Sequence, residues 1–164
     1  MRRIVRAAAQ FAALGLFASA EAADLKGADV KIVDVRAYAY LERAGKLSDN
    51  LVGGAPLVDA PRGGSFGGDT ATALLLDLVF QGDKGASPKD VAATADLTQI
   101  GHNGQRIVTH KTFDHFAFGP DGVAHKALFL EGATCMPLTI EVHAGRSAKS
   151  ARLDFQCEAV QAPK

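Results

Sequence analysis

The sequence contains no tryptophan, and its 164 residues include two cysteines and 7% aromatic residues. It has no excess of either charge, because 18 basic residues balance 18 acidic ones. Without a basic surface nothing attracts a phosphate backbone, so we expect no nucleic-acid partner. The apolar run near the N-terminus is shorter than the roughly 20 residues that cross a bilayer. That run is therefore too short to be a membrane anchor. We also expect no membrane-spanning segment in the chain that remains after the run is cleaved off.

Residues 1–22 have the pattern of a secretory signal peptide. Three arginines within residues 1–6 precede an apolar run over residues 7–18, and small residues lead to a cleavage site near Ala22. Removing this segment leaves 142 residues with 15 basic and 17 acidic side chains, a net charge of −2. We expect Sec-type export to the periplasm or the medium, with residues 23–164 forming one domain of a size that can bury a core.

The rest of the chain predicts an all-β fold. Apolar residues alternate with polar ones in short segments separated by Gly, Pro, Asp and Asn, and no segment has helical periodicity. One segment is apolar on both faces, so we expect it in the centre of a sheet. We predict seven strands, at residues 33–42, 73–80 (the central one), 91–99, 106–113, 123–130, 138–144 and 151–158.

Residues 53–68 interrupt this pattern with six glycines and two prolines. We expect a flexible connection there, with a brief edge pairing at Leu57 and Val58.

The two cysteines, Cys135 and Cys157, frame a predicted β-hairpin. Its two apolar rows should share one face. The register that joins them pairs Leu138 with Phe155, Ile140 with Leu153 and Val142 with Ala151, around a loop at residues 145–148. In an exported chain this arrangement favours a disulfide, which would close a loop of about 23 residues and stabilise the fold by about 3 kcal/mol. A bend at Pro137 would turn Cys135 towards Cys157.

Seven strands at this spacing, ending in such a hairpin, resemble bacterial periplasmic immunoglobulin-like sandwiches over roughly residues 29–158. The resemblance implies two packed antiparallel sheets, and it rests on strand count and spacing. Two features differ from antibody-type domains: there is no tryptophan, and the cysteines would join neighbouring strands instead of the two sheets.

A possible catalytic motif lies in the glycine-rich segment, where residues 63–67 match the nucleophile pattern G-x-S-x-G around Ser65. That motif needs a strand before the serine and a helix after it, and the sequence predicts neither. We interpret it as loop, and we expect no catalytic residue, no cofactor and no enzymatic activity.

Histidines raise a metal hypothesis. If the turn at residues 119–122 forms a hairpin, His115 and His125 become cross-strand neighbours, with Asp114 as a possible third ligand. No ligand spacing is diagnostic, so we expect no metal site and keep a metal or small-ligand carrier as the alternative function. The histidines of the chain are His102, His110, His115, His125 and His143.

Arg36, Tyr38 and Tyr40 share the outward side of the first predicted strand. Arginine and tyrosine are enriched in protein interfaces. The plainer interpretation is a strand face covered by a neighbouring loop. Our leading hypothesis is an exported, non-enzymatic β-sandwich that binds a protein or envelope component through loops or an edge strand, with these three residues as the candidate partner-binding surface.

Overall fold

The computed structural model describes residues 30–54, 57–58, 65–66, 69–71, 73–101, 103–131 and 136–156. One four-stranded sheet is formed by β1 (Lys31–Leu41), β2 (Lys46–Leu47), β6 (Ala73–Gln81) and β9 (Val123–Glu131). The other is formed by β7 (Ala93–Ile100), β8 (Arg106–Phe113), β10 (Leu138–Ala144) and β11 (Ser147–Leu153). Four short strands complete the set: β3 (Leu57–Val58), β4 (Ser65–Phe66), β5 (Asp69–Thr70) and β12 (Phe155–Gln156).

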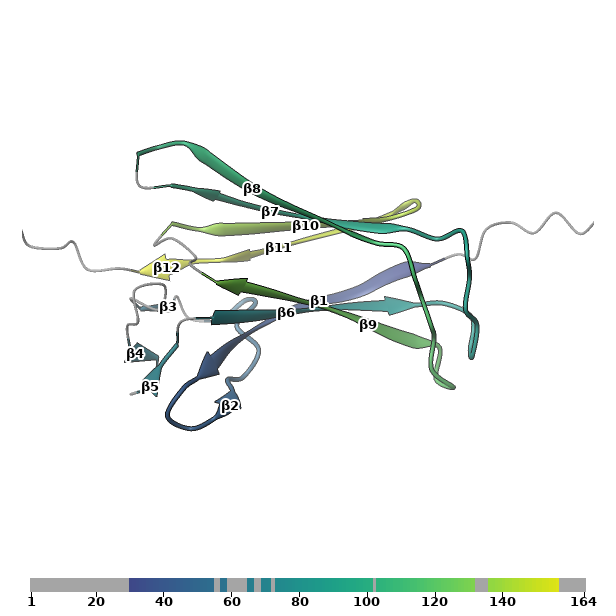
Figure 1. Cartoon of the computed structure of the whole chain (residues 1–164), viewed down its shortest axis with the longest axis horizontal. Helices are drawn as coiled ribbons and strands as arrows, with labels where there is room; N and C mark the ends of the chain where they lie inside the picture. Colours follow the sequence, from purple (N-terminus) through teal and green to yellow (C-terminus); the bar gives the residue numbers. More distant parts are fainter. Residues whose placement is uncertain are drawn as a thin grey trace, which may run out of the picture.

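Both large sheets are antiparallel, and they lie one above the other in Figure 1. The strand order is β2-β1-β6-β9 in the first sheet and β11-β10-β7-β8 in the second. The described residues contain no helix. The prediction of an all-β fold is therefore confirmed, and each of the seven predicted strands has a counterpart among the long strands.

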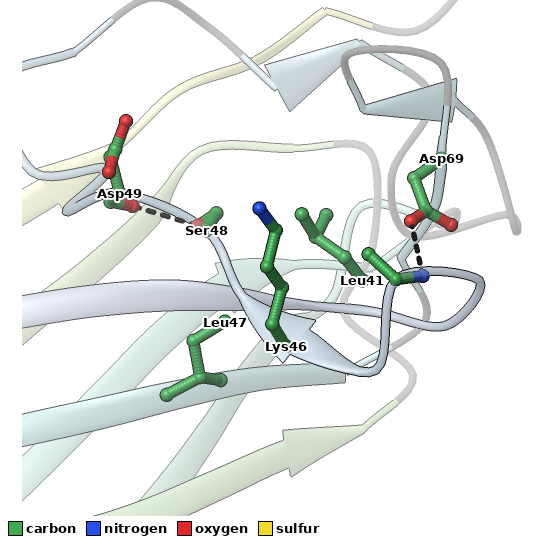
Figure 2. Close-up of a pocket in the computed structure, with 7 residues that line it drawn as sticks. Leu41, Lys46, Leu47, Ser48, Asp49 and Asp69 are labelled. Carbon is green, nitrogen blue, oxygen red and sulfur yellow. Dashed lines mark hydrogen bonds between the residues drawn. The ribbon is translucent and has the colours of Figure 1, made fainter.

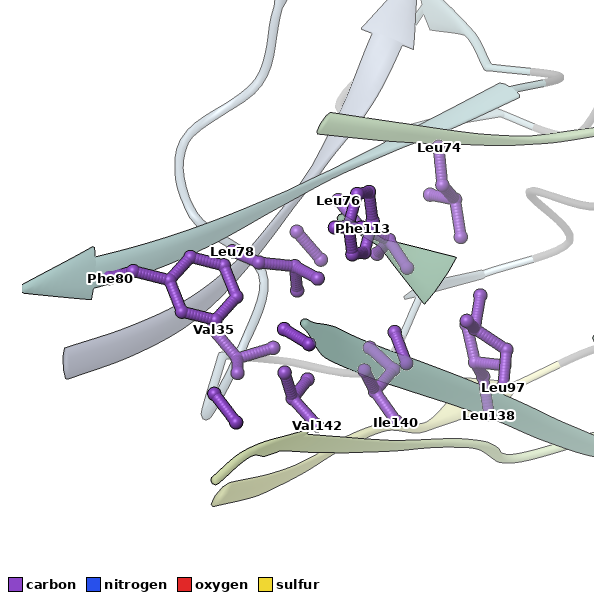
Figure 3. Close-up of a cluster of buried hydrophobic side chains, with 14 of the residues drawn as sticks. Val35, Leu74, Leu76, Leu78, Phe80, Leu97, Phe113, Leu138, Ile140 and Val142 are labelled. Atoms are coloured by element: carbon purple, nitrogen blue, oxygen red, sulfur yellow. The ribbon is translucent and has the colours of Figure 1, made fainter. Parts of the chain in front are cut away.

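A single apolar core fills the space between the inner faces of the two sheets (Figure 3). The first sheet contributes Leu76, Leu78 and Phe80 from β6, which confirms the prediction that this strand is central. The second sheet contributes a matching row from β10, namely Leu138, Ile140 and Val142. Because every second residue of a strand points to one face, alternation in the sequence is sufficient to build this core.

The hairpin on which the metal hypothesis depends does not form. Residues 119–122 do form a turn, with Gly122 N–H donating to the Gly119 carbonyl at 2.9 Å and Gly122 at φ 82°. However, β8 pairs with β7 and β9 pairs with β6, so the chain crosses between the sheets here and makes no hairpin. On this crossing Phe116 packs edge-on against Phe80, with ring centroids 5.0 Å apart. Burial of these rings favours the crossing over a hairpin.

The register of the C-terminal hairpin also differs from the prediction. Leu138 pairs with Leu153 and Val142 with Lys149, so the loop consists of the two residues Gly145 and Arg146. Gly145 has φ 56°, and two-residue loops of this kind match the twist of the flanking strands. A slip of two residues leaves every side chain on its predicted face, which explains why the pattern could not distinguish the registers.

The predicted last strand is also shorter than expected. β11 ends at Leu153, and Phe155 pairs in parallel with Leu57 through β12 and β3. The brief pairing predicted at Leu57 and Val58 is thus confirmed.

Three predictions fall outside the described residues: the signal peptide at residues 1–22, the Cys135–Cys157 disulfide, and most of the flexible segment at residues 53–68. Within the part of the chain that the structure describes, no helix is long and apolar enough to cross a membrane.

Candidate partner-binding face

The outer face of the first sheet carries a row of large side chains that spans three strands. Tyr38 on β1 pairs with Leu75 on β6, and Leu75 pairs with Phe129 on β9. Directly opposed residues of antiparallel strands point to the same face, so these three side chains form a continuous row. Tyr38 and Leu75 are half-buried, whereas Phe129 is 63% exposed.

A second pair extends this row towards the β2 end of the sheet. Tyr40 is opposite Leu47 across β1 and β2, and the two side chains are 42% and 40% exposed. We call the set Tyr38, Tyr40, Leu47, Leu75 and Phe129 the aromatic face. Of the predicted partner-binding residues, Tyr38 and Tyr40 belong to it.

Arg36 lies beside the aromatic face, in a network of charged groups on the same side of the sheet. Its Nε donates to Asp34 Oδ2 at 2.9 Å, and its Nη1 lies 4.0 Å from Asp77 Oδ2. His125 Nδ1 is 2.8 Å from the other oxygen of Asp77. Lys149 approaches Asp34 from β11, with Nζ 3.6 Å from Oδ1.

The network holds Arg36 charged and in place. The hydrogen bond that Arg36 donates to Asp34 raises the pKa of Arg36, and a hydrogen bond that it donates to the Tyr38 side chain acts in the same direction. The same Arg36–Asp34 hydrogen bond lowers the pKa of Asp34 against the opposing effect of burial. The outer face of this sheet therefore has two halves, one of internally paired charges and one of exposed aromatic and aliphatic groups.

The outer face of the second sheet has a different composition. Across three strands, Glu141 is opposite Asp96, and Asp96 is opposite His110, whose Nδ1 lies 2.7 Å from Asp96 Oδ1. Most of the neighbouring outward positions are also polar: Thr94, Thr98, Thr112, Thr139, His143, Ser150 and Arg152. The exceptions are Ile100 and Val108, which are 37% and 48% exposed at one end of this face. This is the usual composition of a solvated sheet face.

A shallow pocket of about 360 Å³ lies at the turn between β1 and β2 (Figure 2). Two of its polar side chains, Asp69 and Ser48, are already used by the turn. Asp69 accepts hydrogen bonds from the backbone N–H groups of Arg43 and Ala44, both at 2.9 Å. Ser48 Oγ accepts from Ala39 N–H and donates to the Asp49 carbonyl. We interpret the pocket as a by-product of this turn.

The structure removes the geometric basis of the metal hypothesis. His125 is opposite Val79 on β6, and the expected hairpin that would bring it beside His115 does not form. His115 Nε2 lies 3.6 Å from Asp114, while His125 contacts Asp77. Among the described residues, no three His, Cys, Asp or Glu side chains are grouped as a metal site requires. His102 lies outside the described residues.

Ser65 belongs to β4, which pairs with β5 in a short antiparallel ladder. Neither strand leads into a helix in the described part of the chain. The strand–turn–helix context of a nucleophile elbow does not occur there.

Three members of the aromatic face, Leu47, Leu75 and Phe129, were not singled out from the sequence. Leu47 lies in a two-residue strand with no periodic signal. Phe129 lies in a predicted strand, and its neighbours Leu128 and Leu130 point inward. A large aromatic residue on the outward side of such a strand was the available signal. Its alignment with Tyr38 depends on pairing through β6, which no local pattern reveals.

Comparison of the chain with models of known protein families finds no match, and comparison with curated proteins finds no similar protein. The candidate function therefore rests on the geometry of the two outer faces.

Proposed function

We propose that the protein is an exported, non-enzymatic β-sandwich module that binds a protein or another envelope component through the aromatic face. The observation that supports this proposal is the row Tyr38–Leu75–Phe129, in which Phe129 is 63% exposed, on a scaffold whose other outer face is mostly polar. A contiguous apolar patch with a polar rim is typical of interaction sites. Arg36 stands at the rim, where its guanidinium can donate hydrogen bonds to a partner's carboxylate or carbonyl oxygens.

The finer classification is part of this proposal. Counting the long strands alone, the chain places the first, second and fifth in one sheet and the seventh, sixth, third and fourth in the other. The constant-type immunoglobulin order differs only in that its fourth strand joins the first sheet. We therefore assign the fold to the immunoglobulin-like sandwiches, with a change of sheet at the fourth strand.

Export and the disulfide complete the proposal. They are supported by the charged and apolar segments of residues 1–22 and by the position of Cys135 and Cys157 around the last hairpin. In the periplasm, a stapled sandwich would present its outer face rigidly to a partner.

Affinity capture from an envelope fraction tests the function. The bait is the tagged protein, compared with the double variant Tyr38→Ser/Tyr40→Ser. An aromatic hot spot at the centre of an interface contributes about 2 kcal/mol or more, so the loss of two should weaken capture by about 4 kcal/mol, or about 1,000-fold. The matched control is Thr139→Ser/Glu141→Ser on the polar face, which should capture as the unsubstituted protein does.

Circular dichroism and the melting temperature of each variant establish that the bait is folded. Equal capture by the folded tyrosine variant and by the unsubstituted protein would show that the aromatic face is not the binding site. Loss of capture in the control variant alone would assign binding to the second sheet.

A further inference from the structure

The four edges of the two large sheets are not equally protected. Beside β1, residues 48–51 continue along the edge: Ser48 N–H donates to the Ala39 carbonyl and Leu51 N–H to the Ala37 carbonyl, at 2.9 and 2.8 Å. The β11 edge lies against the start of β1, where Ile32 N–H donates to Ser147 Oγ at 3.0 Å. Two edges remain, one along β8 and one along β9.

The β8 edge is protected by charge. Seven of its eight residues are exposed, and Arg106 and Lys111 flank the stretch that contains the exposed apolar residues Ile107 and Val108. Positive groups on an edge strand discourage pairing with another copy of the same strand, because like charges would meet.

The β9 edge has no comparable protection. Its one internal lysine, Lys126, is folded back: Nζ donates to the His115 carbonyl and lies 4.9 Å above the ring of Phe116. Beyond it the strand continues as Ala127, Leu128, Phe129 and Leu130. Among the described residues, β9 pairs with β6 and with no other strand. A long apolar edge of this kind is a template for strand pairing.

We propose that β9 pairs antiparallel with β9 of a second copy of this chain, so that the two first sheets become one continuous sheet. The register is centred on Leu128, which faces Leu128 of the partner subunit. Ala127 then faces the partner's Phe129, so that the largest exposed side chain of the strand meets the smallest. His125 faces the partner's Glu131, an imidazole opposite a carboxylate.

The two neighbouring registers that keep the side chains on the same faces are worse. Centring on Phe129 places Ala127 against the partner's Glu131. Centring on Ala127 places His125 against the partner's Phe129. Only the register centred on Leu128 places the large Phe129 opposite the small Ala127 and the His125 imidazole opposite the Glu131 carboxylate. Complementary cross-strand pairs of this kind stabilise a sheet.

This inference goes beyond the proposed function and does not depend on it. The twofold axis of such a dimer is perpendicular to the sheet, so both aromatic faces point to the same side. Two copies of the Tyr38–Leu75–Phe129 row would then lie on one surface. The interface is small, so we expect a dissociation constant in the micromolar range.

Cysteine cross-linking tests the register. Opposed residues of an antiparallel pair have Cα atoms about 4.5–5.5 Å apart, within the range that a disulfide spans. A mixture of the Ala127→Cys and Phe129→Cys chains should therefore form a cross-linked heterodimer under mild oxidation. Ala127→Cys alone should not, because its two cysteines would lie on a diagonal, about 7–8 Å apart or more. The unsubstituted chain gives the background from Cys135 and Cys157.

Sedimentation velocity over a concentration series tests the dimer itself. Glu131→Lys places an ammonium opposite His125 of the partner subunit and should weaken dimerisation about tenfold. The matched control is Glu141→Lys, the same change at an exposed glutamate of the second sheet, which should dimerise as the unsubstituted chain does.

Three results would overturn the proposal: a monomer at every concentration, equal weakening by both lysine variants, or cross-linking of Ala127→Cys alone as efficient as that of the mixture. If an envelope protein instead occupies the β9 edge, Glu131→Lys will reduce its capture while the chain sediments as a monomer, and the proposal is wrong in its choice of partner. Failure of the dimer leaves the proposed function intact, because that is tested at Tyr38 and Tyr40.

Discussion

The two large sheets bury similar inner faces and expose different outer ones. Each contributes a row of aliphatic side chains to the common core, from Leu76 and Leu78 on one side and from Ile140 and Val142 on the other. Outward, the second sheet presents mainly threonines and charged groups, whereas the first presents Tyr38, Tyr40, Leu47 and Phe129. The second sheet shows that this scaffold folds with a polar outer face. The apolar surface of the first sheet is the basis of the proposed contact with a partner.

The outer face of the first sheet is itself divided into a charged half and an apolar half. Near Asp77 the charged groups are paired with one another across three strands, so they offer little to a partner. Near Phe129 the side chains have no such internal use. A partner that docks on this sheet would gain most from the aromatic half, because burial of apolar area is favourable and no internal ion pair has to be broken there.

The largest expected effects are losses of stability from core substitutions, and they should be equal in the two sheets. Leu76→Ala in the first and Ile140→Ala in the second each remove a fully buried side chain, and we expect each to lower the free energy of unfolding by about 2–5 kcal/mol. Both tyrosines of the chain lie in β1, so tyrosine fluorescence reports on the first sheet while far-UV circular dichroism reports on both. Urea transitions followed by the two signals should coincide for each variant.

Thr139→Ala, on the solvated face beside Ile140, serves as the control and should change stability by less than about 0.5 kcal/mol. If Ile140→Ala shifted the dichroism transition and left the fluorescence transition in place, the sheets would unfold separately. The single shared core, and with it the comparison of two faces of one domain, would then be incorrect.

Reduction of the expected disulfide should have a smaller effect than the core substitutions, and this effect should differ between the two sheets. If Cys135 and Cys157 form the expected disulfide, reducing it should cost about 3 kcal/mol, and the loss should be greatest around β10 and β11, which lie between them in the chain. Hydrogen exchange measured by mass spectrometry should then become faster in β10 and β11 than in β6. The Cys135→Ser/Cys157→Ser variant should match the reduced protein. Rapid alkylation of both thiols in the folded, unreduced protein would contradict the disulfide.

Part of this architecture could be predicted from the sequence because burial has a local signature. Alternation with a period of two identified the seven long strands and the inward side of residues such as Leu76 and Ile140, since each choice depends only on neighbours along the chain. An irregularity already limits this reasoning. Strict alternation along β1 would place Val33 on the same side as Val35, but a β-bulge between Ile32 and Asp34 interrupts the register, and Val33 is 44% exposed.

Pairing could not be predicted, because it joins distant segments. A slip of two residues in the hairpin preserves every face, so Val142 could be placed opposite Ala151 or Lys149 with the same pattern. Residues 119–122 form the same turn whether β8 and β9 share a sheet or not. The sequence predicted only the part of the aromatic face that lies on β1, where Tyr38 and Tyr40 are two residues apart. Its other half, at Phe129, depends on the order β1-β6-β9.

The smallest expected effect concerns the charged half of the first outer face, at Asp34. The Arg36 hydrogen bond lowers the pKa of Asp34 below its ordinary value of 3.8, with further contributions from the Val35 N–H and the Lys149 charge. A carboxyl group whose pKa is lowered by folding stabilises the protein above the pKa of the unfolded chain. That contribution is lost as the pH falls through the folded value. Asp34→Asn should therefore be less stable than the unsubstituted protein at about pH 7, and the difference should shrink and disappear as the pH falls below 3.8 and through the lower pKa of the folded state. Because more than a third of the side chain is exposed, solvent screening should limit the difference to less than about 1 kcal/mol. Urea midpoints of the two proteins over this pH range measure it. A difference that stayed constant with pH would mean that the Asp34 side chain acts through its shape or its neutral hydrogen bonds, and that the charged half of the face contributes no ionic stabilisation.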